Sequence, residues 1–235
     1  MSHTPGLHAW SEVAQIKSAT YRVRCECGAS AIAKGKGIDP RCGTSIVNEW
    51  ICWNLIGLLK KKGVENVTAV GASFSYSPIR NQRYGRTAQT GPWYQTCVIL
   101  DDLGKHNRIT PTTAGVTFPG WIYWFDRWVG RLDGPGDTNL LILPSNVVAT
   151  VDWDQVFPWS MGYIPPYARR PDAMDVPSDP RILAARSEEA RASIKSITDG
   201  EIWNIVLSAK IPPECIDMGR LVSFWSGLVL RRDLL

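Results

Sequence analysis

The sequence predicts an α+β protein with a mainly antiparallel sheet, one buried helix, one surface helix and long irregular proline-rich connections. Three observations predict this class. Several segments alternate between apolar and polar residues, as half-buried strands do. Residues 45–62 are apolar around nearly the whole helical circumference, and 16 prolines and 20 glycines punctuate the chain. We expect a core domain over 1–152, a proline-rich arm or long connection over 153–180, and a helix with strands over 181–235 that packs back on the core.

Composition agrees with a globular protein. The chain has 235 residues, of which 44% are hydrophobic and 20% charged, and its formal net charge is +4. That charge is small for a dedicated nucleic-acid-binding domain. No apolar run reaches the roughly 18 residues that span a bilayer, and the amino terminus lacks a secretory signal pattern. We therefore expect no membrane association and a cytoplasmic location, unless the chain belongs to a virus particle.

Residues 21–27 alternate strictly and predict the first strand. The period places Cys25 and Cys27 on one apolar face with Tyr21 and Val23. Residues 33–40 contain two glycines and a proline, which favour a turn or flexible loop.

A helix is predicted over residues 45–62. Thr44 or Ser45 supplies an N-cap, three lysines fall in the last turn, and Gly63 marks the end. Because this helix is apolar all round, it must be covered on several sides, by its own domain or by a neighbouring subunit.

Residues 67–76 and 94–101 are expected to pair as a hairpin. The connection between them carries no acidic residue. It holds Arg80, Arg83, Tyr84 and Arg86. Guanidinium groups and an aromatic ring can bind phosphates or stack on bases. A solvated loop or salt bridges between subunits are the alternatives.

The carboxyl-terminal half contains further elements. Residues 140–143 and 147–151 are expected to be strands on either side of a turn. A surface helix is predicted from Pro180 to about Ile197, with Asp179 as its N-cap. Residues 201–209 and 221–230 are expected to be strands.

The chain has 11 tryptophans, and aromatic residues are dense between positions 118 and 128. One amphipathic stripe cannot use so many, and tryptophan is enriched at interface hot spots. A large core within one chain is the alternative. The expected subunit interface comprises Trp50, Trp53, Trp121, Trp124, Phe125 and Trp128.

Four of the six cysteines cluster near the amino terminus as Cys25, Cys27, Cys42 and Cys52. Zinc binding, core packing and a disulfide all remain open, and core packing is favoured. A one-residue gap between the first two cysteines is uncommon in structural zinc sites, so we expect no cofactor. Cys42 lies in a turn and lacks a packing role, so a disulfide or a subunit boundary is expected there.

A nucleophile could be sought at Ser73 or Ser75, with His106 as the base and Asp101 or Asp102 as its orienting group. The nucleophile elbow requires G-x-S-x-G at a strand-to-helix turn, and this segment continues as a strand. The serines are therefore interpreted as structural, and no catalytic constellation is expected.

The residues LLKKKGV at the end of the predicted helix, followed by ENVTAV, resemble the opening helix-strand unit of phage tail-completion and head-to-tail connector proteins. The resemblance implies a subunit that forms a symmetric ring or lattice with copies of itself and other structural proteins. The expected function is a non-enzymatic structural subunit of a virion. The alternatives are a nucleic-acid-associated module that uses Arg80, Arg83 and Arg86 and could bind zinc, and a hydrolase of unrecognised type.

Overall fold

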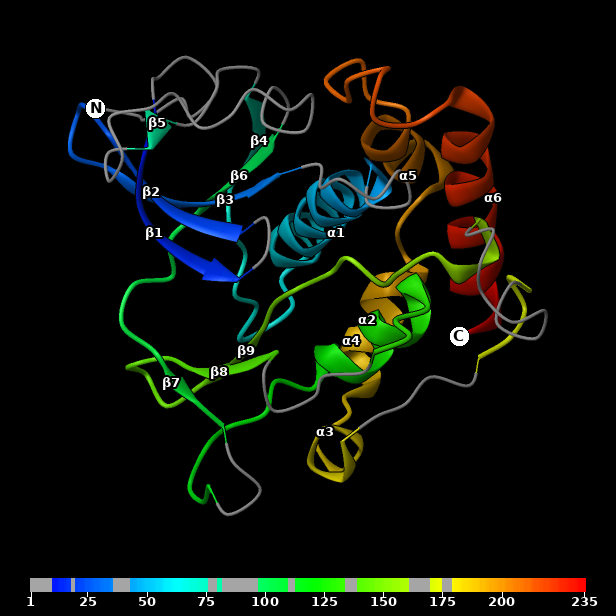
Figure 1. Ribbon diagram of the computed structural model, residues 1–235. Coiled ribbons are helices and arrows are strands. Elements are labelled where there is room, and N and C mark those ends of the chain that lie inside the picture. Colours follow the sequence, from blue (N-terminus) through cyan, green and yellow to red (C-terminus); the bar gives the residue numbers. More distant parts are fainter. Residues whose placement is uncertain are drawn as a thin grey trace.

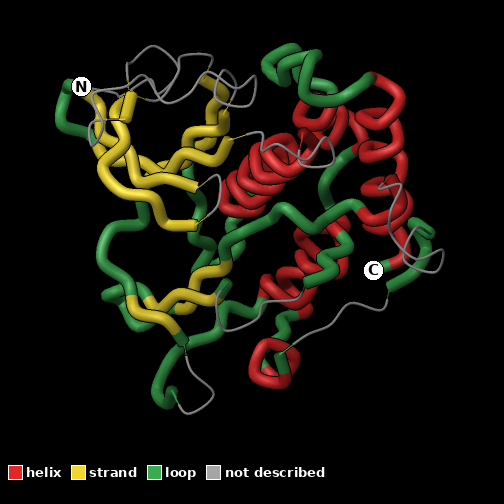
Figure 2. Tube along the Cα trace, viewed as in Figure 1, coloured by secondary structure: helices red, strands yellow, loops and turns green. Residues whose placement is uncertain are grey.

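The computed structural model describes residues 10–17, 20–35, 43–75, 80–81, 97–109, 113–133, 139–160, 170–174 and 179–235. The chain is an α+β protein, as the sequence predicts, and its described elements form two groups (Figure 1). A six-stranded sheet and helix α1 form the first group. A small three-stranded sheet and the remaining helices form the second, and the strands and helices occupy opposite sides of the view in Figure 2.

The larger sheet has the strand order β4-β6-β3-β2-β1-β5. Its strands are β1 (Trp10–Lys17), β2 (Thr20–Cys25), β3 (Ser30–Gly35), β4 (Ala72–Ser75), β5 (Arg80–Asn81) and β6 (Cys97–Asp101). All neighbours pair antiparallel except β1 and β5, which are parallel. The antiparallel pairing of β4 with β6 confirms that residues 67–76 and 94–101 pair, although the first strand begins only at Ala72. The two strands are not a simple hairpin, because β5 lies between them in the sequence and pairs with β1 at the other edge of the sheet.

Helix α1 (Gly43–Lys61) confirms the predicted buried helix. It contacts β4 and β6 on one side and α5 on another, so segments of its own chain cover it. Its end forms a Schellman-type turn, in which Val64 N donates to Leu59 O and Gly63 N to Lys60 O. Gly63 adopts a φ of 82°, which a residue with a side chain would adopt at a cost.

The smaller sheet contains β7 (Asn107–Arg108), β8 (Leu140–Ile142) and β9 (Val148–Thr150) in that order. The antiparallel pairing of β8 with β9 confirms the predicted strands around the turn at residues 144–146. The segment after β6 leads from the larger sheet directly into β7, so the two sheets lie one above the other in Figure 1.

The aromatic segment forms α2 (Trp121–Val129) inside the core of this chain. Trp121, Phe125 and Trp128 are at most 1% exposed, and Trp50 and Trp53 of α1 are nearly as buried. The expected subunit interface through these five residues is therefore wrong, because their rings already pack against one another and against the rest of the chain. Trp124 is half-buried and packs against the same core.

The carboxyl-terminal strands predicted over 201–209 and 221–230 are wrong. These residues lie in α5 (Asp199–Val206) and α6 (Met218–Leu234). A capping box joins Thr198 and Glu201 at the start of α5, and Asp217 caps the start of α6. Each helix therefore has a capped N-terminus, which favours the helix over a strand. The apolar positions then recur every three or four residues, and the core of α1 and α2 buries them.

The surface helix predicted from Pro180 is two helices. Asp179 caps α3 (Pro180–Ala184) as expected, but Ser187 begins a new helix, α4 (Glu188–Lys195), by accepting from Ala190 N. A serine that can cap a helix competes with its continuation through that position. The 3-10 helix η4 (Pro158–Ser160) lies in the expected arm, whose residues 161–169 and 175–178 are outside the described residues.

Two strands in the amino-terminal part were not predicted, namely β1 and β3. Residues 33–35 continue β3 instead of starting a loop, because β2 and β6 pair with them on both sides. Strand β2 ends at Cys25, so Cys25 is buried as expected whereas Cys27 is exposed in the turn that follows. Among the described helices, none combines the length and apolar character needed to cross a membrane.

Candidate functional site

A cavity of about 590 Å³ lies between the two sheets. Its wall is formed by strands β1, β2, β3, β6 and β8, by helix α1 and by the residues after β9. Its apolar lining includes Ile32, Val70, Leu100, Leu103 and Leu141. Its polar lining includes Arg22, Lys34, Glu49, Asp102, His106, Asn139 and Asp152. The cavity therefore combines apolar walls with ionisable groups, as ligand sites do.

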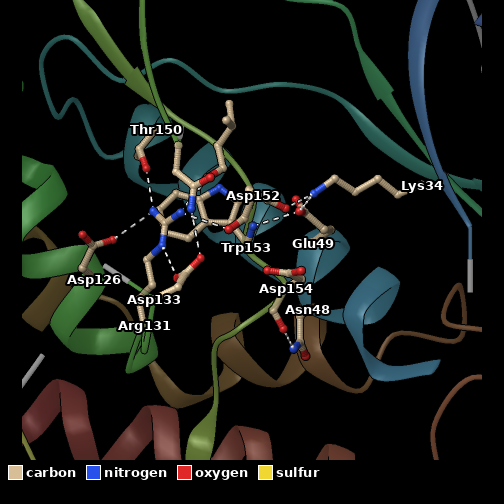
Figure 3. A network of polar contacts seen from close by, with 12 residues as sticks. Lys34, Asn48, Glu49, Asp126, Arg131, Asp133, Thr150, Asp152, Trp153 and Asp154 are labelled. Atoms are coloured by element: carbon tan, nitrogen blue, oxygen red, sulfur yellow. Dashed lines mark hydrogen bonds and ion pairs between the residues drawn. The ribbon is translucent and has the colours of Figure 1, made fainter. Parts of the chain in front are cut away.

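Lys34 connects the two sides of this cavity. It lies on β3, and its Nζ atom forms ion pairs with Glu49 of α1 and with Asp152 after β9, the latter at 2.6 Å (Figure 3). The side chain of Lys34 is 14% exposed and that of Glu49 only 1%. The three residues thus form a largely buried charged network across segments that are far apart in the sequence.

Glu49 is held by more than its ion pair. Its Oε1 atom also accepts from Trp153 N at 2.8 Å, and its Oε2 atom accepts from Trp53 Nε1 at 3.1 Å. A buried carboxylate is tolerated when donors satisfy its oxygens. These donors hold Glu49 in one position, and so keep a negative charge beside the ammonium group of Lys34.

Burial alone would lower the pKa of Lys34, but the nearby charges of Glu49 and Asp152 outweigh it and raise the pKa above its ordinary value. Lys34 is therefore cationic at neutral pH. A cation fixed at the wall of a cavity is a group that can bind an anionic ligand.

Arg131, which follows α2, organises the other side of the site. Its side chain is fully buried. Its guanidinium donates to Thr150 Oγ1 at 2.6 Å, to Val151 O at 2.6 Å and to Asp152 O at 3.0 Å. It also pairs with Asp133 at 3.1 Å (Figure 3). Arg131 therefore fixes both the backbone that carries Asp152 and the carboxylate of Asp133.

Asp133 and Asn139 flank a segment just before β8. Asn139 Nδ2 donates to Asp133 Oδ2 at 2.9 Å, and Asn139 lines the cavity. Burial raises the pKa of Asp133 above its ordinary value, and Arg131 opposes that rise. The hydrogen bond places the carboxylate of Asp133 beside the side chain of Asn139, which lines the cavity together with Asp152.

Asp152 has a φ of 71°, which is uncommon for a residue other than glycine. Such strain persists only where the surroundings hold it, and here Arg131 and Lys34 bind the backbone oxygen and the side chain of Asp152. Asp154 follows two residues later. Burial first, and then the charge of Asp152, raise the pKa of Asp154 to about 6. Carboxylates are therefore crowded around Asp152.

The sequence-predicted hydrolase site is not assembled. Ser73 lies opposite Ile99 in the sheet, and Ala72 lies opposite Leu100. Neighbouring strand residues face opposite sides. Because Leu100 and His106 line the cavity, Ser73 faces the other side of the sheet from His106. Ser75 lies opposite Cys97 and shares the side of Ser73.

The expected cysteine cluster is also divided. Cys25 packs in a hydrophobic cluster with β3 and β6, whereas Cys52 packs in the cluster around α1. Cys42 lies outside the described residues, and the part of the chain that the structure describes contains no group of three metal-ligating side chains arranged for a metal ion. Of the expected anion site, Arg83, Tyr84 and Arg86 are outside the described residues, and only the backbone of Arg80 is described, in β5.

Sequence reasoning missed the residues of the cavity. Lys34 lies in the segment 33–40, which is interpreted from the sequence as a turn or flexible loop. Glu49 carried a usable signal, because it is an acidic residue within a helix that is apolar nearly all round, and a buried charge requires a partner. Asp152 also carried one, because it directly follows a strand.

Comparison of the sequence with models of known protein families finds no match. Comparison with curated proteins finds no match either.

Proposed function

We propose that this protein is a nucleotide-dependent phosphotransferase whose site has the layout used by protein kinases. The observation that carries the proposal is the buried network of Lys34, Glu49 and Asp152 across the cavity. In protein kinases a lysine on the third strand binds nucleotide phosphates and pairs with a glutamate from the following helix, and an aspartate after a later strand binds the metal ion. Lys34 on β3, Glu49 on α1 and Asp152 after β9 follow this order.

The geometry of the cavity supports a nucleotide as the ligand. Apolar side chains from both sheets, including Ile32, Leu100 and Leu141, provide walls for a flat base. The volume of about 590 Å³ is of the size that small-molecule and cofactor sites have. Lys34, which lies two residues after Ile32 on the same face of β3, offers a positive charge for phosphate oxygens.

The residues around Asp152 fit a divalent cation such as Mg²⁺. Oxygen ligands from carboxylates and amides are those that this ion prefers, and Asn139 and Asp152 are the matching pair at the cavity wall. The raised pKa of Asp154, caused by burial and then by the negative charge of Asp152, indicates a surplus of carboxylates that a cation would relieve. When bound, the ion supplies charge neutralisation for the phosphate groups.

Asp133 is the candidate base. In kinases an aspartate of the catalytic loop accepts the proton of the acceptor hydroxyl, and an asparagine several residues later binds metal. Here Asn139 orients Asp133 through the hydrogen bond at 2.9 Å, and Arg131 holds it in place. The transferred γ-phosphoryl group would pass to an acceptor hydroxyl, whose proton Asp133 would take.

The chain departs from the kinase pattern in two places. No glycine occurs in Lys17-Ser18-Ala19-Thr20 between β1 and β2, where kinases have a glycine-rich loop. Trp153 and Asp154 follow Asp152 in place of the usual Phe and Gly. The proposal therefore rests on the charged network and not on these motifs.

The expectations of a virion structural subunit and of a nucleic-acid-associated module stay predictions. Among the described residues, α5 and α6 expose the apolar side chains Trp203, Met218, Val222, Leu230 and Leu234. Contacts between subunits of a virion would be sought at these side chains. The charged network favours phosphoryl transfer because burying Lys34 and Glu49 adds little stability and is better explained by a ligand.

The test is ATP binding to the full chain in the presence of Mg²⁺, measured by calorimetry, together with transfer of labelled γ-phosphate. We expect Lys34→Met to weaken ATP binding by about tenfold or more, since a phosphate contact is lost. Lys62→Met is the matched control, because Lys62 pairs with Glu201 on the surface. Asp152→Asn, which keeps the size of the side chain, should abolish the Mg²⁺ dependence. A wild-type protein that does not bind ATP, or a folded Lys34→Met variant that binds it normally, would overturn the proposal.

A further inference from the structure

We infer that Cys25 and Cys27 form a redox-active dithiol at the turn between β2 and β3, which a peroxide converts to an intrachain disulfide. This site is separate from the cavity and does not depend on the proposed function. The turn lies on the side of the molecule away from α5 and α6 (Figure 1). Neither thiol is in a disulfide in the structure.

The turn brings the two residues together. Cys25 N donates to Ala29 O and Gly28 N donates to Cys25 O, both at 2.9 Å, and Gly28 has a φ of 89°. Cys27 N donates to Cys25 Sγ at 3.5 Å, so the sulfur of Cys25 lies over the backbone of Cys27. Residues two apart have Cα atoms at most about 7 Å apart, close to the span that a disulfide bridges.

The two thiols have different environments. Cys27 is exposed, whereas Cys25 is 3% exposed in the sheet. A hydrogen bond from the backbone of Ala29, followed by one from the thiol of Cys25, lowers the pKa of Cys27. Burial raises the pKa of Cys25. Cys27 is therefore the thiolate that reacts, and Cys25 the thiol that resolves the product.

The chemistry balances with hydrogen peroxide as the oxidant. The Cys27 thiolate attacks one peroxide oxygen and the O–O bond breaks, which gives a sulfenic acid and, after protonation, one water. The Cys25 sulfur then attacks the Cys27 sulfur. An S–S bond forms, the S–OH bond breaks, and the Cys25 proton leaves with the hydroxyl group as a second water. Two thiols are oxidised and one peroxide is reduced.

The other described thiols, those of Cys52, Cys97 and Cys215, are all buried and offer a contrast. Cys97 lies in the same hydrophobic cluster as Cys25, but it is 1% exposed and burial raises its pKa to about 12. Cys52 is fully buried, and burial raises its pKa well above the ordinary value. Buried thiols of high pKa are inert toward peroxide. Oxidation should therefore be selective for the Cys25–Cys27 turn.

The test is peroxide treatment of the full chain in a Cys42→Ser background, which removes the one amino-terminal thiol outside the described residues. Remaining thiols are alkylated and the peptides are analysed by mass spectrometry. We expect the peptide with both cysteines to lose two hydrogens and both alkylation sites, and dithiothreitol to restore them. A Cys97→Ser variant should behave identically.

Two variants separate the roles of the two thiols. Cys27→Ser should slow oxidation of Cys25 by at least about tenfold, because the reactive thiolate is gone. Cys25→Ser should leave Cys27 as sulfenic or sulfinic acid, because no resolving thiol remains. The inference is overturned if the wild-type peptide remains fully alkylated, if Cys27 forms a disulfide only between two molecules, or if Cys25 oxidises equally fast without Cys27.

Discussion

Arg131 and Asp126 form an ion pair that is almost completely inaccessible to water, with Nη1 and Oδ1 3.7 Å apart. Arg131 is otherwise well bonded, but neither oxygen of Asp126 accepts a hydrogen bond. The carboxylate of Asp126 is therefore buried without a hydrogen-bond donor. It lies next to Arg131, which also binds Asp133 and Asp152.

Asp126 should make the protein less stable as the pH rises. Burial raises its pKa to about 7, although the charge of Arg131 opposes the rise. Between its ordinary pKa and this value, the folded chain holds a proton that the unfolded chain has lost. The free energy of unfolding therefore falls with rising pH, by up to roughly 1.4 kcal/mol per pH unit.

Asp126→Asn should flatten the stability profile between about pH 4 and 7, as measured by urea unfolding across that window. Asp133 and Asp154 keep part of the slope, since burial raises the pKa of each. Asp172→Asn is the control, because Asp172 is exposed and Arg170 lowers its pKa. Parallel profiles for wild type and Asp126→Asn would show that Asp126 does not titrate in this window.

Glu49→Gln should destabilise the protein by about 3–5 kcal/mol, because it breaks a buried pair and leaves the ammonium of Lys34 with Asp152 alone. Glu201→Gln is the matched control. Glu201 pairs with Lys62 at a partly exposed site, and glutamine preserves the capping box, so a loss of at most about 1 kcal/mol is expected. Equal losses in the two variants would contradict a buried network at Glu49.

The guanidinium of Arg231 in α6 lies over the ring of Trp159 and donates to the backbone oxygens of Arg127, Trp128, Pro171 and Ala173. Burial lowers its pKa to about 10. Arg231→Met should cost about 3 kcal/mol or more, because several buried acceptors lose a charged donor.

Hydrogen exchange locates the effect of Arg231→Met. Amides of residues 172–174 should exchange faster, because their segment loses its bonds to α6. Arg220→Met, at a more exposed position on the same helix with an ion pair to Asp217, should leave them unchanged. Unchanged exchange at residues 172–174 in Arg231→Met would show that Arg231 does not hold this segment against α6.

Two glycines in helices should respond in opposite directions to alanine. A Cβ atom at Gly227 of α6 would clash with Trp159 Nε1, whose hydrogen bond to Ser223 O fixes the ring. Gly227→Ala should therefore lose about 1–3 kcal/mol to overpacking. At Gly57 of α1 nothing lies within 4 Å, so Gly57→Ala should gain about 0.5–1 kcal/mol. Thermal unfolding of both variants measures this, and a stabilising Gly227→Ala would refute the close approach of α6 to Trp159.

Local patterns were enough to predict several elements. The period of apolar residues and the capping residues predicted α1, the β8–β9 pair and the Asp179 cap, because these depend on neighbours within a few residues. The same reasoning failed at α5 and α6. There the apolar runs fit a strand or a helix, and packing against α1 and α2 together with the caps selects the helix.

By itself, the sequence determined the α+β class and the buried helix with its Gly63 end. Only the tertiary structure decided the candidate site. Lys34 meets a glutamate 15 residues away and an aspartate 118 residues away. Neither separation corresponds to a local period, so long-range pairing of strands and packing of α1 brings these charges together. The physical reason is that ionic contacts act through space, whereas propensity and periodicity act along the chain.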